Sequence, residues 1–227
     1  MKLKKIASLM LAGVMAVSML AGCNTTSVDP EPTPDPDPTP ATGYSVEMAS
    51  YLSDAAKKDY IAFEDNADDL AALEDALGKL SWTTTAGYTL PKVATPVIDW
   101  VGGADTDLMV NDFVDALDIE NTNMDDDWVW DALVIDYNRG DAETVKYGLM
   151  YVIDGTVDEN DALEGIADNV EILLGNLPNV NDYTLTRYTY DYTVSVSVAN
   201  KPLDVIDWYN GSANFIAVTV TRVPTAA

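Results

Sequence analysis

Oxygen-bearing side chains crowd the stretch from residue 118 to residue 127. They are Asp118, Glu120, Asn121, Asn123, Asp125, Asp126 and Asp127. Carboxylate and amide oxygens are the ligands that Ca²⁺ prefers in proteins, so the stretch is a candidate calcium site. The proposed ligands are Asp118, Glu120, Asn123, Asp125 and Asp127. The spacing is not that of an EF-hand, which needs a glycine at its sixth position and a glutamate at its twelfth. The alternative is structural, because residues 125–127 would also favour the N-terminus of a following helix.

Aromatic side chains offer a second kind of chemistry. The chain has five tryptophans and twelve tyrosines but only three phenylalanines, and rings with a polar tip suit sugar stacking and protein recognition. Tyr188, Tyr190 and Tyr192 alternate along one face of an expected strand and would form a flat ligand-binding platform if that face is exposed. If helices cover the face, the same rings form part of the core. We favour the core interpretation.

Several catalytic chemistries are excluded by composition. Histidine is absent and Cys23 is the only cysteine, which excludes Ser-His-Asp and Cys-His catalytic systems and histidine-ligated zinc. Neither a phosphate-binding G-x-x-x-x-G-K-[ST] loop nor a dinucleotide-binding G-x-G-x-x-G turn occurs. A hydrolase that uses two carboxyl groups remains an alternative. However, with 38 acidic side chains in the chain, no two can be identified as the catalytic pair, so we do not favour an enzyme.

The first 23 residues have the parts of an export signal. Lys2, Lys4 and Lys5 precede an apolar stretch of about fifteen residues, which suits a signal sequence and is too short to span a bilayer. The stretch ends in Leu20-Ala21-Gly22-Cys23, which resembles the lipobox of bacterial lipoproteins. The resemblance implies removal of residues 1–22 and a diacylglyceryl group, with its palmitate-type chains, on Cys23. It also implies an anchor on the outer face of the cell membrane, or in the outer membrane of a host with two membranes.

Residues 23–43 are expected to be a tether. Proline occupies every second position from Pro30 to Pro40, and this alternation favours an extended polyproline II conformation. Such a spacer could reach about 60 Å from the lipid. The chain carries a net charge of −26, which repels nucleic acid and attracts cations and basic partners. Loss of the signal lysines would make the charge more negative still.

The remaining residues, 44–227, predict one acidic α+β domain. The expected helices are 45–63, 66–79, 105–117, one beginning near 125, one from 145 to Gly155, and 158–174. Residues 188–198 and 215–223 predict two long strands, because their apolar side chains recur at every second position. Residues 202–209 are expected to form one or two helical turns, and 82–90 are a candidate third strand. About five N-terminal helices would then pack on a small C-terminal antiparallel sheet.

The chain also contains two short motifs. Val-Ile-Asp followed by an aromatic residue begins at Val97, Val134 and Val205, with a glycine three residues after each aromatic, and this could mark a helical repeat of about 36 residues. Independent packing of similar tetrapeptides is the alternative, and we favour it. The tripeptide 139–141, Arg-Gly-Asp, matches an integrin-recognition signal but equally suits a turn.

Together these features predict a membrane-anchored bacterial surface lipoprotein. Its expected role is non-catalytic: binding, adhesion or envelope structure, with a glycan or protein partner at the surface. A carbohydrate-binding module that uses exposed Trp or Tyr is one alternative. A small carboxylate-dependent hydrolase is the other. No cofactor is expected apart from the candidate Ca²⁺.

Overall fold

The structure is a computed structural model that describes residues 42–80, 90–97, 104–122, 143–181, 186–205 and 209–227. Within these residues the helices are α1 (Tyr44–Tyr51), α2 (Ala67–Leu77), α5 (Ala104–Leu117) and α7 (Glu159–Asn176). The strands are β1 (Ile61–Phe63), β2 (Thr95–Pro96), β3 (Ile119–Thr122), β4 (Val145–Asp154), β5 (Val180–Asn181), β6 (Tyr188–Val205) and β7 (Tyr209–Ala226). The α+β class predicted from the sequence is confirmed.

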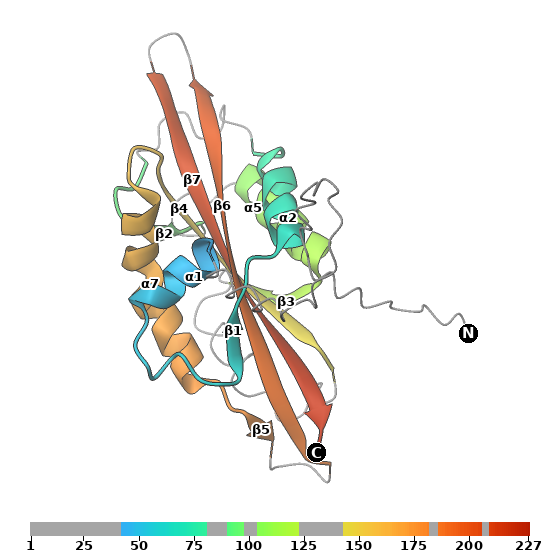
Figure 1. The fold of residues 1–227 in the computed structure, drawn as a ribbon. Coiled ribbons are helices and arrows are strands. Elements are labelled where there is room, and N and C mark those ends of the chain that lie inside the picture. Colours follow the sequence, from blue (N-terminus) through green and yellow to red (C-terminus); the bar gives the residue numbers. More distant parts are fainter. Residues whose placement is uncertain (1–41, 81–89, 98–103, 123–142, 182–185, 206–208) are drawn as a thin grey trace, which may run out of the picture. The chain divides into compact units, whose positions relative to one another are not determined.

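One mixed sheet organises the described residues, in the order β1-β6-β7-β4-β2 (Figure 1). β6 and β7 pair antiparallel without interruption, from Tyr188 opposite Ala226 to Val205 opposite Tyr209. β4 pairs antiparallel with the other side of β7, from Val145 to Asp154. The short strands β1 and β3 run parallel to β6 and β4 respectively, so the sheet is not purely antiparallel as expected.

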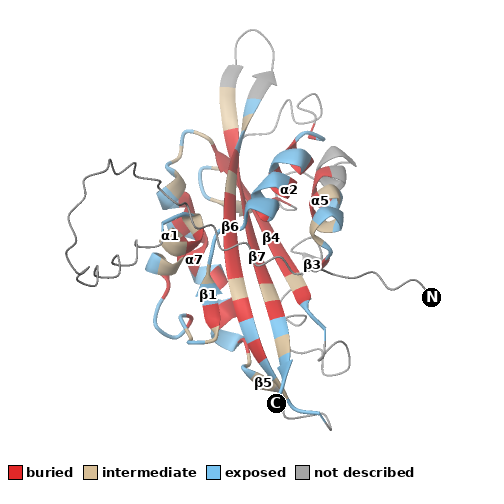
Figure 2. Cartoon of the chain, turned by 45° about the vertical axis from the view of Figure 1, so that its right-hand side comes forward, coloured by how far each residue is buried: buried red, intermediate tan, exposed pale blue. Residues whose placement is uncertain are grey.

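Helices cover both faces of the sheet (Figure 2). One core lies between the sheet and α1 and α7, and it contains Tyr151 of β4, Val194 of β6 and Val218 of β7. The other lies on the α2 and α5 side and contains Val152 of β4 and Phe215 of β7. Successive side chains of a strand point to opposite faces, so each long strand contributes to both cores.

The helices with clear 3.6-residue periods form where the sequence predicts them. Asn66 caps α2, since its side chain accepts a hydrogen bond of 2.9 Å from the Asp68 N–H. Asp158 caps α7 in the same way, by accepting from the Asn160 N–H. α5 begins one residue before the predicted start. These caps satisfy N–H groups that have no partner within the helix.

The helix predicted from residue 145 to Gly155 is wrong, because this segment is the strand β4. The strand lies between β7 and the short strands β2 and β3, with a helical layer over each face. Nearly all its residues are therefore buried, and the polar positions that mark a half-exposed strand are missing. A strand buried on both faces is a continuous apolar run, which periodicity does not distinguish from a helix.

Two further helix predictions need correction. The helix predicted over 45–63 ends at Tyr51, because Leu52 adopts an extended backbone, and residues 61–63 form β1 instead. Helical turns do not form at the start of 202–209, because β6 continues to Val205 and β7 begins at Tyr209. Of the Val-Ile-Asp motifs, only Val97 and Val205 lie within the described residues, so the repeat stays a prediction. The candidate third strand 82–90 lies outside the described residues except for Leu90, and β4 is the long third strand.

Candidate functional site

The tyrosines of β6 lie on the face that α1 and α7 cover. Tyr190 and Tyr192 are buried, with exposed fractions of 3% and 2%, and Tyr188 is half-buried against the same core. The Tyr192 hydroxyl donates to the Pro178 carbonyl at 2.8 Å. Its ring centroid lies 6.1 Å from that of Tyr60 and 6.5 Å from that of Tyr190. Tyr190 and Tyr192 therefore pack as core residues and do not form an exposed platform.

A cation reinforces this aromatic cluster. The Arg222 guanidinium of β7 lies 5.0 Å from the centroid of the Tyr190 ring and is largely buried. Burial raises the pKa of the Tyr192 hydroxyl, while the positive charge of Arg222 opposes the shift. The hydroxyl is consequently protonated and acts as a hydrogen-bond donor, which suits a structural role.

The candidate calcium ligands fall mainly outside the described residues. Asp118 follows α5 with φ 53°, a left-handed conformation, and its side chain is exposed. Glu120 and Asn121 belong to β3. Asn123, Asp125, Asp126 and Asp127 lie in the segment 123–142, which the structure does not describe. In the described part of the chain, no group of three or more acidic side chains is placed to hold a metal. Calcium binding stays a prediction.

Other residues singled out from the sequence are also outside the described part of the chain. They include Cys23, the Arg-Gly-Asp tripeptide at 139–141, and all five tryptophans, at positions 82, 100, 128, 130 and 208. The expected role of exposed tryptophans in sugar binding therefore stays a prediction.

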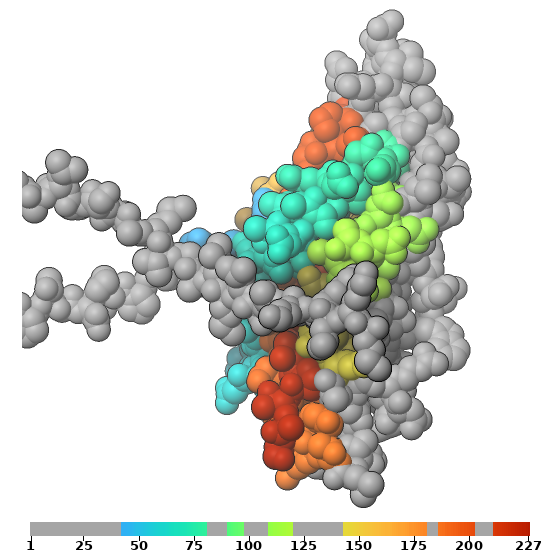
Figure 3. All heavy atoms as spheres, turned by 90° about the vertical axis from the view of Figure 1, so that its right-hand side faces the viewer, coloured from blue at the N-terminus to red at the C-terminus, as the bar shows by residue number. Residues whose placement is uncertain are grey.

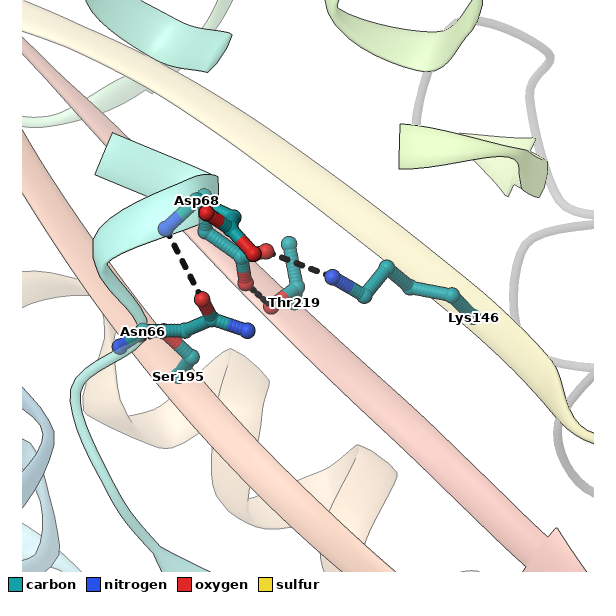
Figure 4. A network of polar contacts seen from close by, with 6 residues as sticks. Asn66, Asp68, Lys146, Ser195 and Thr219 are labelled. Atoms are coloured by element: carbon teal, nitrogen blue, oxygen red, sulfur yellow. Dashed lines mark hydrogen bonds and ion pairs between the residues drawn. The ribbon is translucent and has the colours of Figure 1, made fainter. Parts of the chain in front are cut away.

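A buried charged pair joins α2 to the sheet (Figure 4). Asp69, in the first turn of α2, is 1% exposed, and its Oδ1 lies 2.5 Å from the Nζ of Lys146 on β4. The Thr219 hydroxyl of β7 donates to the other carboxylate oxygen of Asp69. The Lys146 side chain is 17% exposed. Both carboxylate oxygens thus have a partner, as a buried charge requires.

The same end of α2 is attached to β6. The Asn66 N–H donates to the Ser195 hydroxyl at 3.1 Å, one turn before Asp69 (Figure 4). Figure 3 shows α2, in teal, lying beside α5, in green, on this face of the molecule. Three strands therefore hold the N-terminus of α2 through polar contacts. Sequence patterns gave no sign of this pair, because Asp69 and Lys146 are 77 residues apart.

A second polar contact links the end of β4 to an adjacent loop. Lys92 Nζ lies 2.8 Å from Asp154 Oδ2, and the Thr156 N–H donates to Asp154 Oδ1 at 2.9 Å. Partial burial alone would raise the pKa of Asp154, but the hydrogen bonds from Lys92 and Thr156 outweigh it and the pKa is lowered. The pair is at the surface on the Lys92 side, so it fixes the turn rather than forming a reactive centre.

The first folded residues are attached to the edge of the sheet. Ser45 is fully buried; its hydroxyl accepts from the Val196 N–H at 2.9 Å, and its own N–H donates to Asp65 Oδ1 at 2.9 Å. The Tyr44 hydroxyl donates to Glu159 at the start of α7, and this hydrogen bond, with burial and the negative charge, raises the Tyr44 pKa to about 12. The start of the domain is therefore fixed to both β6 and α7.

Comparisons with known proteins found no match: not to a model of a protein family, a characterised protein or a solved structure. Among the described helices, none has both the length and the apolar character that crossing a membrane requires. Any functional assignment therefore depends on the sequence motifs and on the geometry described above.

Proposed function

We propose that this protein is a bacterial surface lipoprotein whose domain has a non-catalytic binding, adhesion or envelope-structural role. The observation that carries the proposal is the sequence Leu20-Ala21-Gly22-Cys23 at the end of a basic and then apolar N-terminal segment. Two acyl chains on one residue provide enough buried CH₂ groups for stable membrane attachment. Residues 24–43 would act as the spacer between lipid and domain.

The attachment of the first folded residues supports this arrangement. A tether transmits any pull on the domain to the residues where the fold begins, which are Tyr44 and Ser45. Ser45 is hydrogen-bonded to the edge of β6 and to Asp65, and Tyr44 is hydrogen-bonded to α7. Force on the tether would therefore be distributed over the sheet and a long helix, and would not simply unwind α1.

A projecting arm supports a binding role. β6 and β7 stay paired beyond the last residue pair that β7 makes with β4, which is Asp154 with Ala213. Within the described residues, the arm comprises 203–205 of β6 and 209–211 of β7, and it extends past the helices at one end of the sheet (Figure 1). A two-stranded ribbon without a third strand is only marginally stable by itself, so an arm of this kind is suited to contact a partner.

The anchor is tested by labelling the protein with radioactive palmitate in a bacterial host. We expect label in the wild type, no label in a Cys23→Ser variant, and release of the variant from the membrane fraction. Unlabelled wild-type protein would refute the lipoprotein assignment. An exported but unlabelled protein would indicate an ordinary secretory signal.

The binding role is tested by shortening the arm. Residues 203–211 are replaced by Asn-Gly, a dipeptide that favours a two-residue hairpin turn. Cells that display the wild type should adhere to host glycans or proteins, and cells with the shortened arm should lose this adhesion while the domain keeps its melting temperature. Equal adhesion by both would remove the arm from the proposal. Hydrolysis of a glycan by the purified protein would instead favour the hydrolase alternative.

A further inference from the structure

The contact between Asp69 and Lys146 places an amine nitrogen close to a carboxyl carbon inside the protein. The Lys146 Nζ is 2.5 Å from Asp69 Oδ1, and Asp69 is 1% exposed. Leu73, one turn later on α2, and Ile119, the register partner of Lys146 on β3, are buried in one apolar core together with Phe113. An amine and a carboxyl group held together in a largely buried site can react with each other.

We propose that the Lys146 Nζ and the Asp69 Cγ become joined by an isopeptide bond in the folded protein. The ammonium first transfers one proton to Asp69 Oδ1, which frees the nitrogen lone pair to attack Cγ. The N–C bond forms, a second nitrogen proton passes to Oδ1, and the Cγ–Oδ1 bond breaks to release water. One ammonium and one carboxylate thus become one amide and one water, with no oxidant, reductant or other co-reactant.

The hydrogen bonds of Asp69 divide its two oxygens between the two roles that the reaction needs. Oδ1 faces the lysine and can receive its protons, so it is the oxygen that leaves. Oδ2 accepts a hydrogen bond from the Thr219 hydroxyl, so it is the oxygen that remains as the amide carbonyl. Negative charge develops on this oxygen when nitrogen attacks, and a fixed donor stabilises that charge. Thr219 would therefore act as an oxyanion-stabilising residue.

The fold also favours the reaction thermodynamically. α2 and β4 hold the two groups together, and well-oriented intramolecular reactions have effective molarities of about 10⁵–10⁸ M. Burial penalises the charged pair, whereas the amide carries no net charge on either partner. Asp69 is 1% exposed, so little water reaches its carbonyl carbon to hydrolyse the product. Each effect shifts the balance toward condensation, which is unfavourable for the same groups in bulk water.

The bond would give the domain a covalent cross-link that its cysteine content does not provide. Cys23 is the only cysteine, so residues 44–227 contain no disulfide. Asp69 and Lys146 are 77 residues apart and lie on different layers. The amide would join the α2 layer permanently to the sheet, which is useful in a protein exposed outside the cell.

Intact-mass spectrometry of the purified protein, produced from residue 24 onward, tests the proposal. The wild type should be lighter than its sequence mass by one water molecule. The matched control is Lys146→Arg, which keeps the positive charge but should retain the full sequence mass. A wild-type mass equal to the sequence mass, before and after prolonged incubation of the folded protein, overturns the proposal.

Two further variants locate the bond and test its chemistry. Asp69→Asn should lose ammonia instead of water if the same carbon is attacked, and Thr219→Val should form the bond several-fold more slowly. Proteolysis of the wild type should yield one branched peptide that contains both Asp69 and Lys146. A branched peptide that lacks either residue, or loss of water that persists in Lys146→Arg, also overturns the proposal.

Discussion

Replacing Ser45 with alanine tests how the start of the domain is attached to the sheet. The Ser45 hydroxyl is the acceptor for the Val196 N–H, at a distance of 2.9 Å, and Ser45 is fully buried. Alanine has no acceptor, so the amide of an edge strand would lose its partner without gaining access to water. An unsatisfied buried donor costs about 1–3 kcal/mol.

The helix itself partly offsets this cost. Ser45 is the second residue of α1, and alanine is the better helix former by about 0.3–0.5 kcal/mol. The expected net loss of stability is therefore about 0.5–2.7 kcal/mol. A domain of this size changes its melting temperature by about 2–4 °C for each kcal/mol.

Urea denaturation and amide hydrogen exchange measure the two consequences separately. The matched control is Ser50→Ala in the same helix, where an exposed hydroxyl donates only to the Glu47 carbonyl at 2.7 Å. The control should change stability by less than about 0.5 kcal/mol. Exchange at the Val196 amide should accelerate in Ser45→Ala and stay unchanged in Ser50→Ala. Equal stabilities, or unchanged exchange at Val196, would refute the reasoning.

Three other predictions concern pH, the sheet edge and two glycines. The pKa of Asp154 is lowered, so its contact with Lys92 should stabilise the fold at pH values above 3.8, the ordinary pKa of the group, and should lose this effect as the pH falls through the lowered pKa. Asp154→Asn should therefore be less stable than the wild type at pH 6. The difference in melting temperature should shrink below about pH 4. Pro202→Val should keep the melting temperature but increase the apparent mass in concentration-dependent light scattering, and an unchanged mass would contradict a role of Pro202 in protecting the edge of β6. Gly155→Ala should destabilise the protein by about 1–3 kcal/mol, because the new Cβ would lie 2.8 Å from the Ser212 carbonyl oxygen. Gly165→Ala in α7 should stabilise it by about 0.5–1 kcal/mol, because no atom lies within 4 Å of the new Cβ. Equal effects of the two substitutions in urea denaturation would be evidence against both predictions.

The proline in β6 lies where it costs no hydrogen bond within the ribbon. The N–H groups of Tyr190, Tyr192 and Val196 point away from β7, toward the Asn179 carbonyl, the Tyr60 carbonyl and the Ser45 hydroxyl. The register continues unbroken, so the Pro202 nitrogen also faces away from β7. Pro202 is exposed, and at this edge it removes a donor that a second chain could use. Valine would restore that donor.

The sequence by itself determined the elements in which polar and apolar residues recur with a clear period. α2, α5 and α7 each bury one stripe and begin near residues that indicate a helix start, such as Asn66 and Asp158. β6 and β7 were predicted from alternating side chains. In the helices, solvent on one side leaves a readable polar pattern, whereas in β6 and β7 serine and threonine alternate with apolar residues even where they are buried, as at Ser195 and Thr219.

Only the tertiary structure decided the identity of β4 and the arrangement of polar contacts. β4 is covered on both faces, so its sequence has no solvent-facing positions from which a period could be read. Tyr190 became a core residue because α1 and α7 cover its face, and alternation alone does not say which face is covered. Lys146 meets Asp69 because the sheet brings α2 beside β4 across 77 residues of chain. Contacts between residues so far apart in the sequence depend on the topology of the fold, which local sequence patterns do not reveal.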